Sequence, residues 1–266
     1  MRILFVGDVV GQLGLTLVQK YMPALKHQLK PQVTIINGEN IADGKGITER
    51  LYKALLLAGA DVVTLGNHAF RKRETVDFIG GTSKLIRPAN FPPQVPGAGY
   101  TMINVNGVKL AVVNLQGRVF LDNIDDPFQK IDILLTKIKT ETDLCFVDFH
   151  GEATSEKLAF AHYVDGRVAA VIGTHTHVQT NDARILAKGT AYLSDVGMVG
   201  SYNGILGVKP EPVLHSFLTN LPSRFEPIES GPGQLGACYI DLDATSGKAK
   251  KIQLIRIDPD HPLMEM

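Results

Sequence analysis

Short, continuously apolar runs rich in β-branched residues constrain the fold of this chain more than any other feature. They cover residues Ile3 to Val6, Val33 to Ile36, Val62 to Leu65, Leu110 to Val113, Leu144 to Phe149 and Val168 to Ile172. Because polar residues do not alternate within these runs, the pattern is typical of strands buried on both faces. Segments of helical period lie between several of the runs, at residues 51–57, 131–138 and 155–163. This order of strands and helices predicts an α/β fold with a mainly parallel or mixed sheet.

Two other segments predict antiparallel pairing. Asn106-Gly107 and Ser246-Gly247 each separate two apolar runs, which is the pattern of a hairpin turn. We therefore expect a mixed sheet or two packed sheets. No repeat, low-complexity tract or linker composition interrupts the 266 residues, a length that one hydrophobic core can serve, so we expect one domain over residues 1–266.

Composition restricts the partners and the location. Lys and Arg together number 27, as do Asp and Glu, so no global positive field attracts a long nucleic acid, and small substrates are favoured. Cys145 and Cys238 lie in apolar, strand-like segments, which favours buried thiols in a reducing compartment over a disulfide. The sequence has no secretory leader pattern and no apolar stretch near the ~18 residues of a membrane span, so we expect a cytoplasmic protein. The sequence is compatible with a homo-oligomer.

Polar side chains follow these apolar runs at the points where the predicted strands end. They are Asp8, Glu39, Asn40, Asn67, His68, His150, His175 and His177. Taken alone, each residue has an ordinary structural explanation that needs no functional site. Asp8 could form an Asx turn or a helix cap, and His150 could be a hydrogen-bonded ring. Open α/β sheets, however, build their ligand sites at the carboxyl ends of strands. We therefore expect these groups to converge on one site.

The residue types indicate a metal centre. On an extended chain, His175 and His177 at positions i and i+2 would point the same way, and a bound divalent cation gives a reason for two neighbouring imidazoles. No cysteine lies among the candidates, which disfavours a thiolate zinc site. Imidazole, carboxylate and amide ligands suit Mn²⁺, Fe or Zn²⁺, and there are more of them than one tetrahedral ion can use. We therefore expect two ions that share one bridging carboxylate.

The motifs "GDVVG", "NGENIADGKG", "GNHAF", "FHGE" and "GTHTHV" occur in this order. Together they resemble the calcineurin-like metallophosphoesterases, and more closely the bacterial YmdB-like branch, over residues 1 to about 207. The resemblance implies mixed β-sheets packed as a sandwich and flanked by helices. The segment from Pro210 onward shares the family likeness without site residues.

The resemblance also implies roles for the candidate residues. One ion would be held by Asp8, Glu39 and His177. Glu39 would bridge to a second ion, which Asn67, His150 and His175 would complete. His68 would protonate the leaving oxygen, in agreement with the requirement that a general acid lie beside the metals without being a ligand.

Three positions depart from the superfamily pattern. Val10 replaces a usual histidine ligand, and Glu39 replaces the usual bridging aspartate. Asn40 could then supply an oxygen to the first ion, and this larger share of oxygen ligands favours Mn²⁺ or Fe over Zn²⁺. Ala69 replaces a common acidic residue, which leaves the orientation of His68 without an explanation.

Other polar residues near the motifs receive structural roles. We expect Lys45 to lie in a solvated turn, Thr174 and Thr176 to hold the backbone of their loop, and Asp195 to support a ligand histidine.

The leading hypothesis is a dinuclear phosphodiesterase for small phosphodiesters, and the YmdB-like resemblance implies 2′,3′-cyclic nucleotides. A metal-bridging hydroxide would attack phosphorus while His68 acts as the acid. One alternative is a phosphomonoesterase or 5′-nucleotidase, which would need more positive charge near the metals. Another is a metal-dependent nucleotide-binding regulatory protein without turnover, which would not need His68. A ribonuclease for long RNA is disfavoured by the zero net charge.

Overall fold

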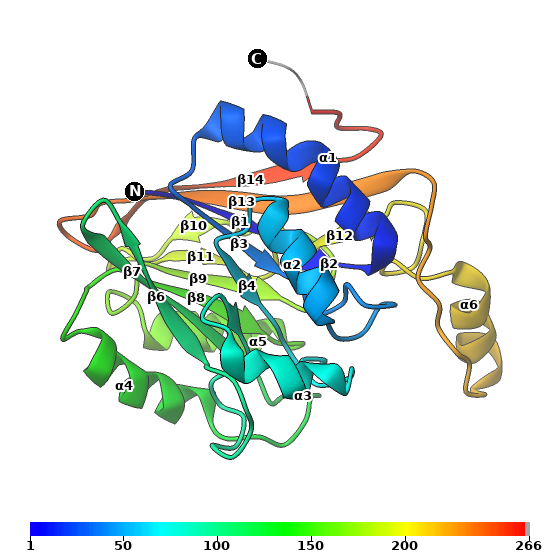
Figure 1. Cartoon of the computed structure of the whole chain (residues 1–266), viewed down its shortest axis with the longest axis horizontal. Helices are drawn as coiled ribbons and strands as arrows, with labels where there is room; N and C mark the ends of the chain where they lie inside the picture. The colour runs from blue at the N-terminus through cyan, green and yellow to red at the C-terminus, as the bar shows by residue number, and fades with distance from the viewer. Residues whose placement is uncertain (264–266) are drawn as a thin grey trace.

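The computed structural model describes residues 1–263, whose strands form two sheets packed face to face (Figure 1). The first sheet has the order β2 (Asp8–Val9), β12 (Met198–Ser201), β13 (Gly233–Leu242), β1 (Arg2–Val6), β3 (Val33–Asn37), β4 (Val62–Thr64) and β5 (Leu85–Ile86), with β14 (Ala249–Ile257) paired to β13. The second has the order β10 (Arg184–Ile185), β11 (Ala191–Leu193), β9 (Ala170–Thr174), β8 (Cys145–His150), β7 (Val108–Gln116) and β6 (Tyr100–Val105). Both sheets mix parallel and antiparallel pairs, so the predicted mixed α/β sandwich is confirmed.

Helices cover the outer faces of the two sheets (Figure 1). On the first sheet lie α1 (Gly11–Leu29), α2 (Glu49–Leu57) and α3 (Glu74–Phe78), the last continued by a 3₁₀ turn at Ile79–Gly81. On the second lie α4 (Pro127–Ile138) and α5 (Thr154–Tyr163). The last helix, α6 (Pro210–Thr219), stands away from both sheets (Figure 1).

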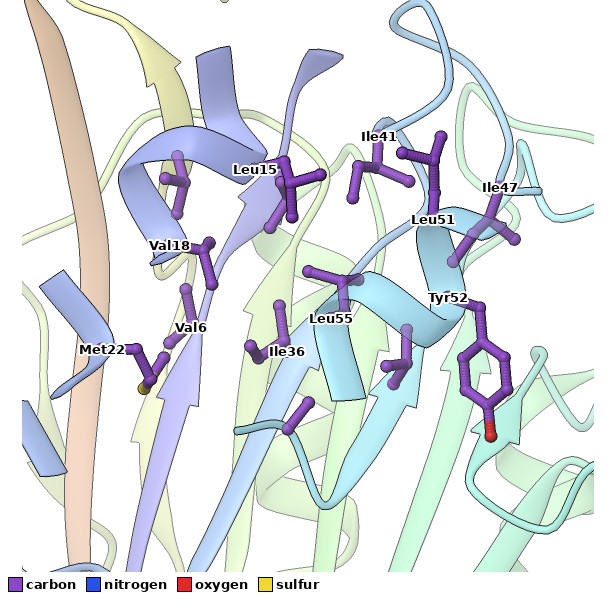
Figure 2. Close-up of a cluster of buried hydrophobic side chains, with 14 of the residues drawn as sticks. Val6, Leu15, Val18, Met22, Ile36, Ile41, Ile47, Leu51, Tyr52 and Leu55 are labelled. Carbon is purple, nitrogen blue, oxygen red and sulfur yellow. The ribbon is translucent and has the colours of Figure 1, made fainter. Parts of the chain in front are cut away.

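Strand β1 illustrates how the layers are held together. Its side chains alternate, so Ile3 and Phe5 enter the cluster between the sheets while Leu4 and Val6 enter the cluster under the helices. Figure 2 shows this helix-side cluster, in which apolar side chains of α1 and α2 meet those of the strands. Burial on both faces explains why the strand runs are continuously apolar.

The predicted strands, the three helices and both hairpins are present. Helix α1 was not predicted, because it has no side-chain cap and contains Gly14 and Pro23. Tertiary packing explains Gly14, since a Cβ there would overlap the carbonyl oxygen of Val199 on β12. Cys145 and Cys238 are buried free thiols, as predicted.

A membrane-spanning helix is not found in the described part of the chain, where every helix is too short or too polar to cross a bilayer.

Candidate metal centre

All of the predicted site residues lie in one connected network at the carboxyl ends of strands from both sheets. The first sheet contributes Asp8 after β1, at the start of β2, together with Glu39 and Asn40 after β3, and Asn67 and His68 after β4. The second contributes His150 at the end of β8, and His175 and His177 after β9. Asp8, Glu39, Asn40 and His150 are buried, whereas Asn67, His68, His175 and His177 are partly exposed. The site therefore has a closed floor and an open side.

Glu39, His150 and His175 form one compact group, in which one potential ligand atom from each residue lies within 4.8 Å of the others. His150 Nε2 lies 3.1 Å from Glu39 Oε1, 3.0 Å from His175 Nδ1 and 2.9 Å from Asn67 Oδ1. One ring nitrogen cannot satisfy these three neighbours with a single hydrogen or lone pair. A divalent cation among the four side chains would satisfy them all.

The other nitrogen of His150 is held in a way that frees Nε2. Thr174 donates its hydroxyl hydrogen to Asp148 over 2.7 Å, so its oxygen accepts a hydrogen bond from His150 Nδ1 over 2.9 Å. A protonated Nδ1 leaves a lone pair on Nε2, the arrangement found in metal-ligating histidines. Thr174 therefore orients the ring of His150, a candidate ligand, instead of holding its loop backbone, contrary to our prediction.

A second group of ligand atoms surrounds Asn40. Its Nδ2 lies 2.9 Å from His177 Nε2 and 3.3 Å from Glu39 Oε1. His177 Nδ1 donates to the carbonyl oxygen of Leu206 over 3.0 Å, which leaves Nε2 free to bind a metal. A 180° rotation of the Asn40 amide would present its oxygen to the same place. Both groups include an amide, but only the second needs its amide rotated, since Asn67 already presents Oδ1.

Asp8 completes the floor of the site and is fully buried. Its Oδ2 accepts a hydrogen bond from the backbone N–H of His175 over 3.2 Å, whereas Oδ1 has no hydrogen-bond partner among residues 1–263. Burial raises the pKa of this carboxyl group well above its ordinary value. A buried, unpartnered carboxylate oxygen beside imidazoles fits a bound cation, and so does the oxygen and nitrogen donor set around it.

The electrostatics of the other candidate ligands also fit a cation. Burial favours the neutral form of Glu39, but the charges and hydrogen bonds of His150 and His68 outweigh it and hold the pKa of Glu39 well below its ordinary value. Burial opposes a charged His150, yet Glu39 and Asp8 raise its pKa to about 9, so in the metal-free site this ring carries a positive charge that a bound cation would replace. Burial and His150 lower the pKa of His175 to about 3, so this ring is neutral and available as a ligand at neutral pH.

The loop that carries His175 and His177 is not extended, so the reasoning from positions i and i+2 was wrong. Strand β9 ends at Thr174, and the two histidines have φ values of 105° and 64°. These are left-handed conformations that residues with a Cβ rarely adopt, so the surrounding structure must hold them. The rings reach the site because the chain turns there, and not because it continues as a strand.

Asp195 and Lys157 hold this loop. Asp195 Oδ2 accepts hydrogen bonds from the N–H of Thr176 over 2.9 Å and from Lys157 Nζ over 2.8 Å, and Oδ1 accepts from the N–H of Gly197 over 2.9 Å. Both ionic side chains are about 2% exposed. We had expected Asp195 to support a ligand histidine, but its carboxylate contacts neither imidazole ring and holds the backbone between them.

The structure explains the orientation of His68 without an acidic residue at position 69. Asn40 Oδ1 lies 2.9 Å from His68 Nδ1, and Glu39 Oε2 accepts the backbone N–H of His68 over 3.1 Å. The His68 side chain is 19% exposed, and its Nε2 has no hydrogen bond to the described residues. This nitrogen is therefore available to a bound molecule.

Further contributors were not singled out in the sequence. Glu152 Oε2 lies 3.1 Å from His175 Nε2, and its place two residues after His150 in "FHGE" was a usable signal. The Leu206 carbonyl that orients His177 carries no side-chain signal. Position 66 has room only for glycine, because a Cβ there would overlap Glu39 and the His150 ring. Lys45 is exposed, as predicted.

Comparisons with known proteins identify the family of this chain. The chain matches the model of the YmdB-like protein family over residues 4–255. It is 54% identical over 265 residues to the 2′,3′-cyclic-nucleotide 2′-phosphodiesterase of Bacillus subtilis, with 100% of each chain covered. A Mycoplasma pneumoniae crystal structure described as a novel phosphatase superposes with a TM-score of 0.91 at 32% identity, covering 98% of this chain and 95% of the other. A Thermus thermophilus crystal structure superposes with a TM-score of 0.90 at 42% identity, covering 97% and 99%. This chain therefore belongs to the YmdB-like family, as its strand-end motifs predicted.

Proposed function

We propose that this chain is a dinuclear metal-dependent phosphodiesterase that hydrolyses small phosphodiesters, and that its substrates are 2′,3′-cyclic nucleotides. The observation that carries the proposal is the network that places His68 beside two groups of metal-ligand atoms with Glu39 in common. The activity named for the B. subtilis relative, which is 54% identical, supports the substrate class.

The two groups would hold two ions. One ion would be held by Glu39, Asn67, His150 and His175, and the other would be held by Asp8, Glu39, Asn40 and His177. The mixture of oxygen and imidazole ligands favours Fe or Mn²⁺, with Zn²⁺ as the third option. When bound, such ions supply Lewis-acid polarisation of the phosphoryl group and activation of the attacking water.

The chain itself supplies the proton and the orientation. With its amide rotated so that Oδ1 faces the ion, Asn40 presents Nδ2 to Nδ1 of His68, a contact of 2.9 Å. Nδ1 then accepts a hydrogen bond, and Nε2 carries the proton that can pass to the leaving ribose oxygen. Asn40 contacts His177 as well, and it therefore fixes the acid relative to the metal ligands. The closed floor formed by Asp8 and His150 restricts the substrate to the open side, beside His68.

The proposal is tested with a panel of 2′,3′-cyclic, 3′,5′-cyclic and linear phosphodiesters, assayed with Mn²⁺, Fe²⁺ and Zn²⁺. Glu39→Ala should lose both metal content and turnover. His68→Ala should keep the metals and lose about 10²- to 10⁴-fold in kcat, the usual contribution of a general acid. His215→Ala, at an exposed position on α6, serves as the control.

Wild-type turnover in both Glu39→Ala and His68→Ala would refute the proposal. Faster hydrolysis of a phosphomonoester than of any diester would favour the phosphomonoesterase alternative. Persistent binding of a cyclic nucleotide without product would favour a regulatory binding protein.

We also propose that the chain folds as a single domain in the cytoplasm. Both sheets contribute to one apolar cluster, for example through Phe5 and Phe146, which argues for one cooperative unit. The buried free thiols of Cys145 and Cys238 suit a reducing compartment.

A further inference from the structure

Gln116, the last residue of β7, is a buried polar residue whose side chain has no partner. Its side chain is fully buried, and neither Oε1 nor Nε2 has a hydrogen-bond partner among residues 1–263. A buried primary amide normally makes hydrogen bonds, and leaving it without them is costly. Asp8 Oδ1 shares this property, and a bound cation explains it there. Gln116 needs a different explanation, because it offers a donor as well as an acceptor.

The strand register places Gln116 beside the metal centre. Gln116 pairs with His150 in the parallel β7–β8 ladder, so their side chains lie on the same face at a spacing of ~4.8 Å. That face is directed at the first sheet, because Asn114, two residues earlier, accepts a hydrogen bond from the N–H of Leu65 over 3.4 Å. The chain continues from Leu65 into Asn67 and His68. The unpartnered amide is therefore next to His150, on the face directed at the first sheet, where β4 leads into Asn67 and His68.

The backbone of Gln116 is held on both sides by one buried side chain. Asn90 Nδ2 donates to the carbonyl oxygen of Gln116 over 2.7 Å, and Asn90 Oδ1 accepts its N–H over 2.9 Å. Asn90 is fully buried and also donates to the carbonyl oxygen of Asp125 over 2.9 Å. The fold thus fixes the strand end that carries the amide while it leaves the amide itself unpaired. Fixed polar groups of this kind are typical of ligand contacts.

The charge of the surroundings indicates what the amide would bind. Lys157 is paired with Asp195 over 2.8 Å, and Arg118, two residues after Gln116, is paired with Asp126 over 2.9 Å. The donor next to His150 is thus a neutral amide and not an unpaired cation. A neutral donor suits the single negative charge of a phosphodiester, whereas the two charges of a monoester favour a cationic partner.

We propose that Gln116 is a substrate-binding residue whose Nε2–H donates to a non-bridging phosphoryl oxygen of the diester. The inference rests on the proposed function and adds a residue that favours diesters over monoesters. It also separates the roles of two neighbours on the second sheet, since His150 holds metal while Gln116 holds substrate.

The test uses Gln116→Met, which keeps the size of the side chain and removes the amide. The thermal midpoint should be equal to or higher than that of the wild type, because an unpaired buried amide is lost. Metal content should be unchanged, and kcat/KM for 2′,3′-cyclic AMP should fall about 10- to 100-fold, the range for a hydrogen bond to a charged group. Gln253→Met is the matched control, because Gln253 is exposed on β14 in the first sheet and its amide oxygen accepts a hydrogen bond from Tyr239 over 2.7 Å.

Gln116→Glu separates the donor from the acceptor, because it keeps an oxygen and removes the N–H. Its kcat/KM should fall at least as far as that of Gln116→Met. Wild-type kcat/KM in either variant, or a lower metal content in Gln116→Met, would overturn the inference. A lower thermal midpoint with full activity would also overturn it, since that is the result for an amide bound to an internal water. If the wild type itself hydrolyses no diester, the proposed function fails first, and the two failures are therefore distinguishable.

Discussion

The buried ion pair of Lys157 and Asp195 gives the sharpest prediction about how the site is built. Lys157→Met leaves Asp195, which is 1% exposed, with only the N–H groups of Thr176 and Gly197. Asp195→Asn leaves the ammonium group of Lys157 buried without its carboxylate. Removing one partner of a buried pair costs about 3–5 kcal/mol of unfolding free energy, a large share of the roughly 5–15 kcal/mol that stabilises a domain. Removing both should cost less than the sum, with a coupling energy of about 2 kcal/mol.

Urea denaturation of the metal-free single and double variants measures these free energies, provided that the dependence of the unfolding free energy on urea concentration is the same for all of them. The control is Lys72→Met, because Lys72 pairs over 2.7 Å with Asp43, a side chain that is 86% exposed. That change should alter the free energy of unfolding by less than about 1 kcal/mol. Both variants of the buried pair should also bind metal about 10- to 100-fold more weakly, because the loop between the two histidines loses its anchor. Additive single effects, or unchanged metal affinity, would refute the reasoning.

Metal binding should release protons, because the pKa of His150 is raised to about 9 while ligation needs a neutral ring. Titration calorimetry near neutral pH in two buffers of different ionisation enthalpy should show that about one proton leaves this ring when metal binds. The affinity for metal should rise with pH up to about 9. A metal affinity that does not depend on pH would contradict the assignment of His150 as a ligand. Gly66→Ala should abolish metal retention in elemental analysis, whereas Gly80→Ala, which has open space around it, should not. Heating the metal-free protein should give one calorimetric transition, and two resolved transitions would rule out a single domain.

The strand ends were predictable because the same short segments carry two signals. A continuously apolar run marks a strand buried on both faces, and a polar residue directly after it marks the carboxyl edge of the sheet. Glu39 after β3 and His150 at the end of β8 were found in this way. Gln116 ends β7 with the same pattern, so it could have been found as well, although no family motif drew attention to it.

The local conformations were not predictable, because tertiary contacts determine them. The left-handed backbone of His175 and His177 is held by Asp195, which lies 20 residues after His175 in the chain. The two contacts of Asn40, to His68 and His177, depend on how three loops meet. Helix α1 forms without a capping side chain because it packs on β12, a strand far away in the sequence.

Strand β1 pairs with β3 on one side and with β13 on the other, and its Arg2 is bonded to Asp241, 239 residues away. The second edge of β1 therefore has no native partner until almost the whole chain has been synthesised. At about 5–20 residues per second, a ribosome needs roughly 10–50 s to reach that point. During this time an apolar strand edge is open to other chains. Loss of β13 by premature termination should make this protein a client of chaperones and proteases before it affects the chemistry of the site.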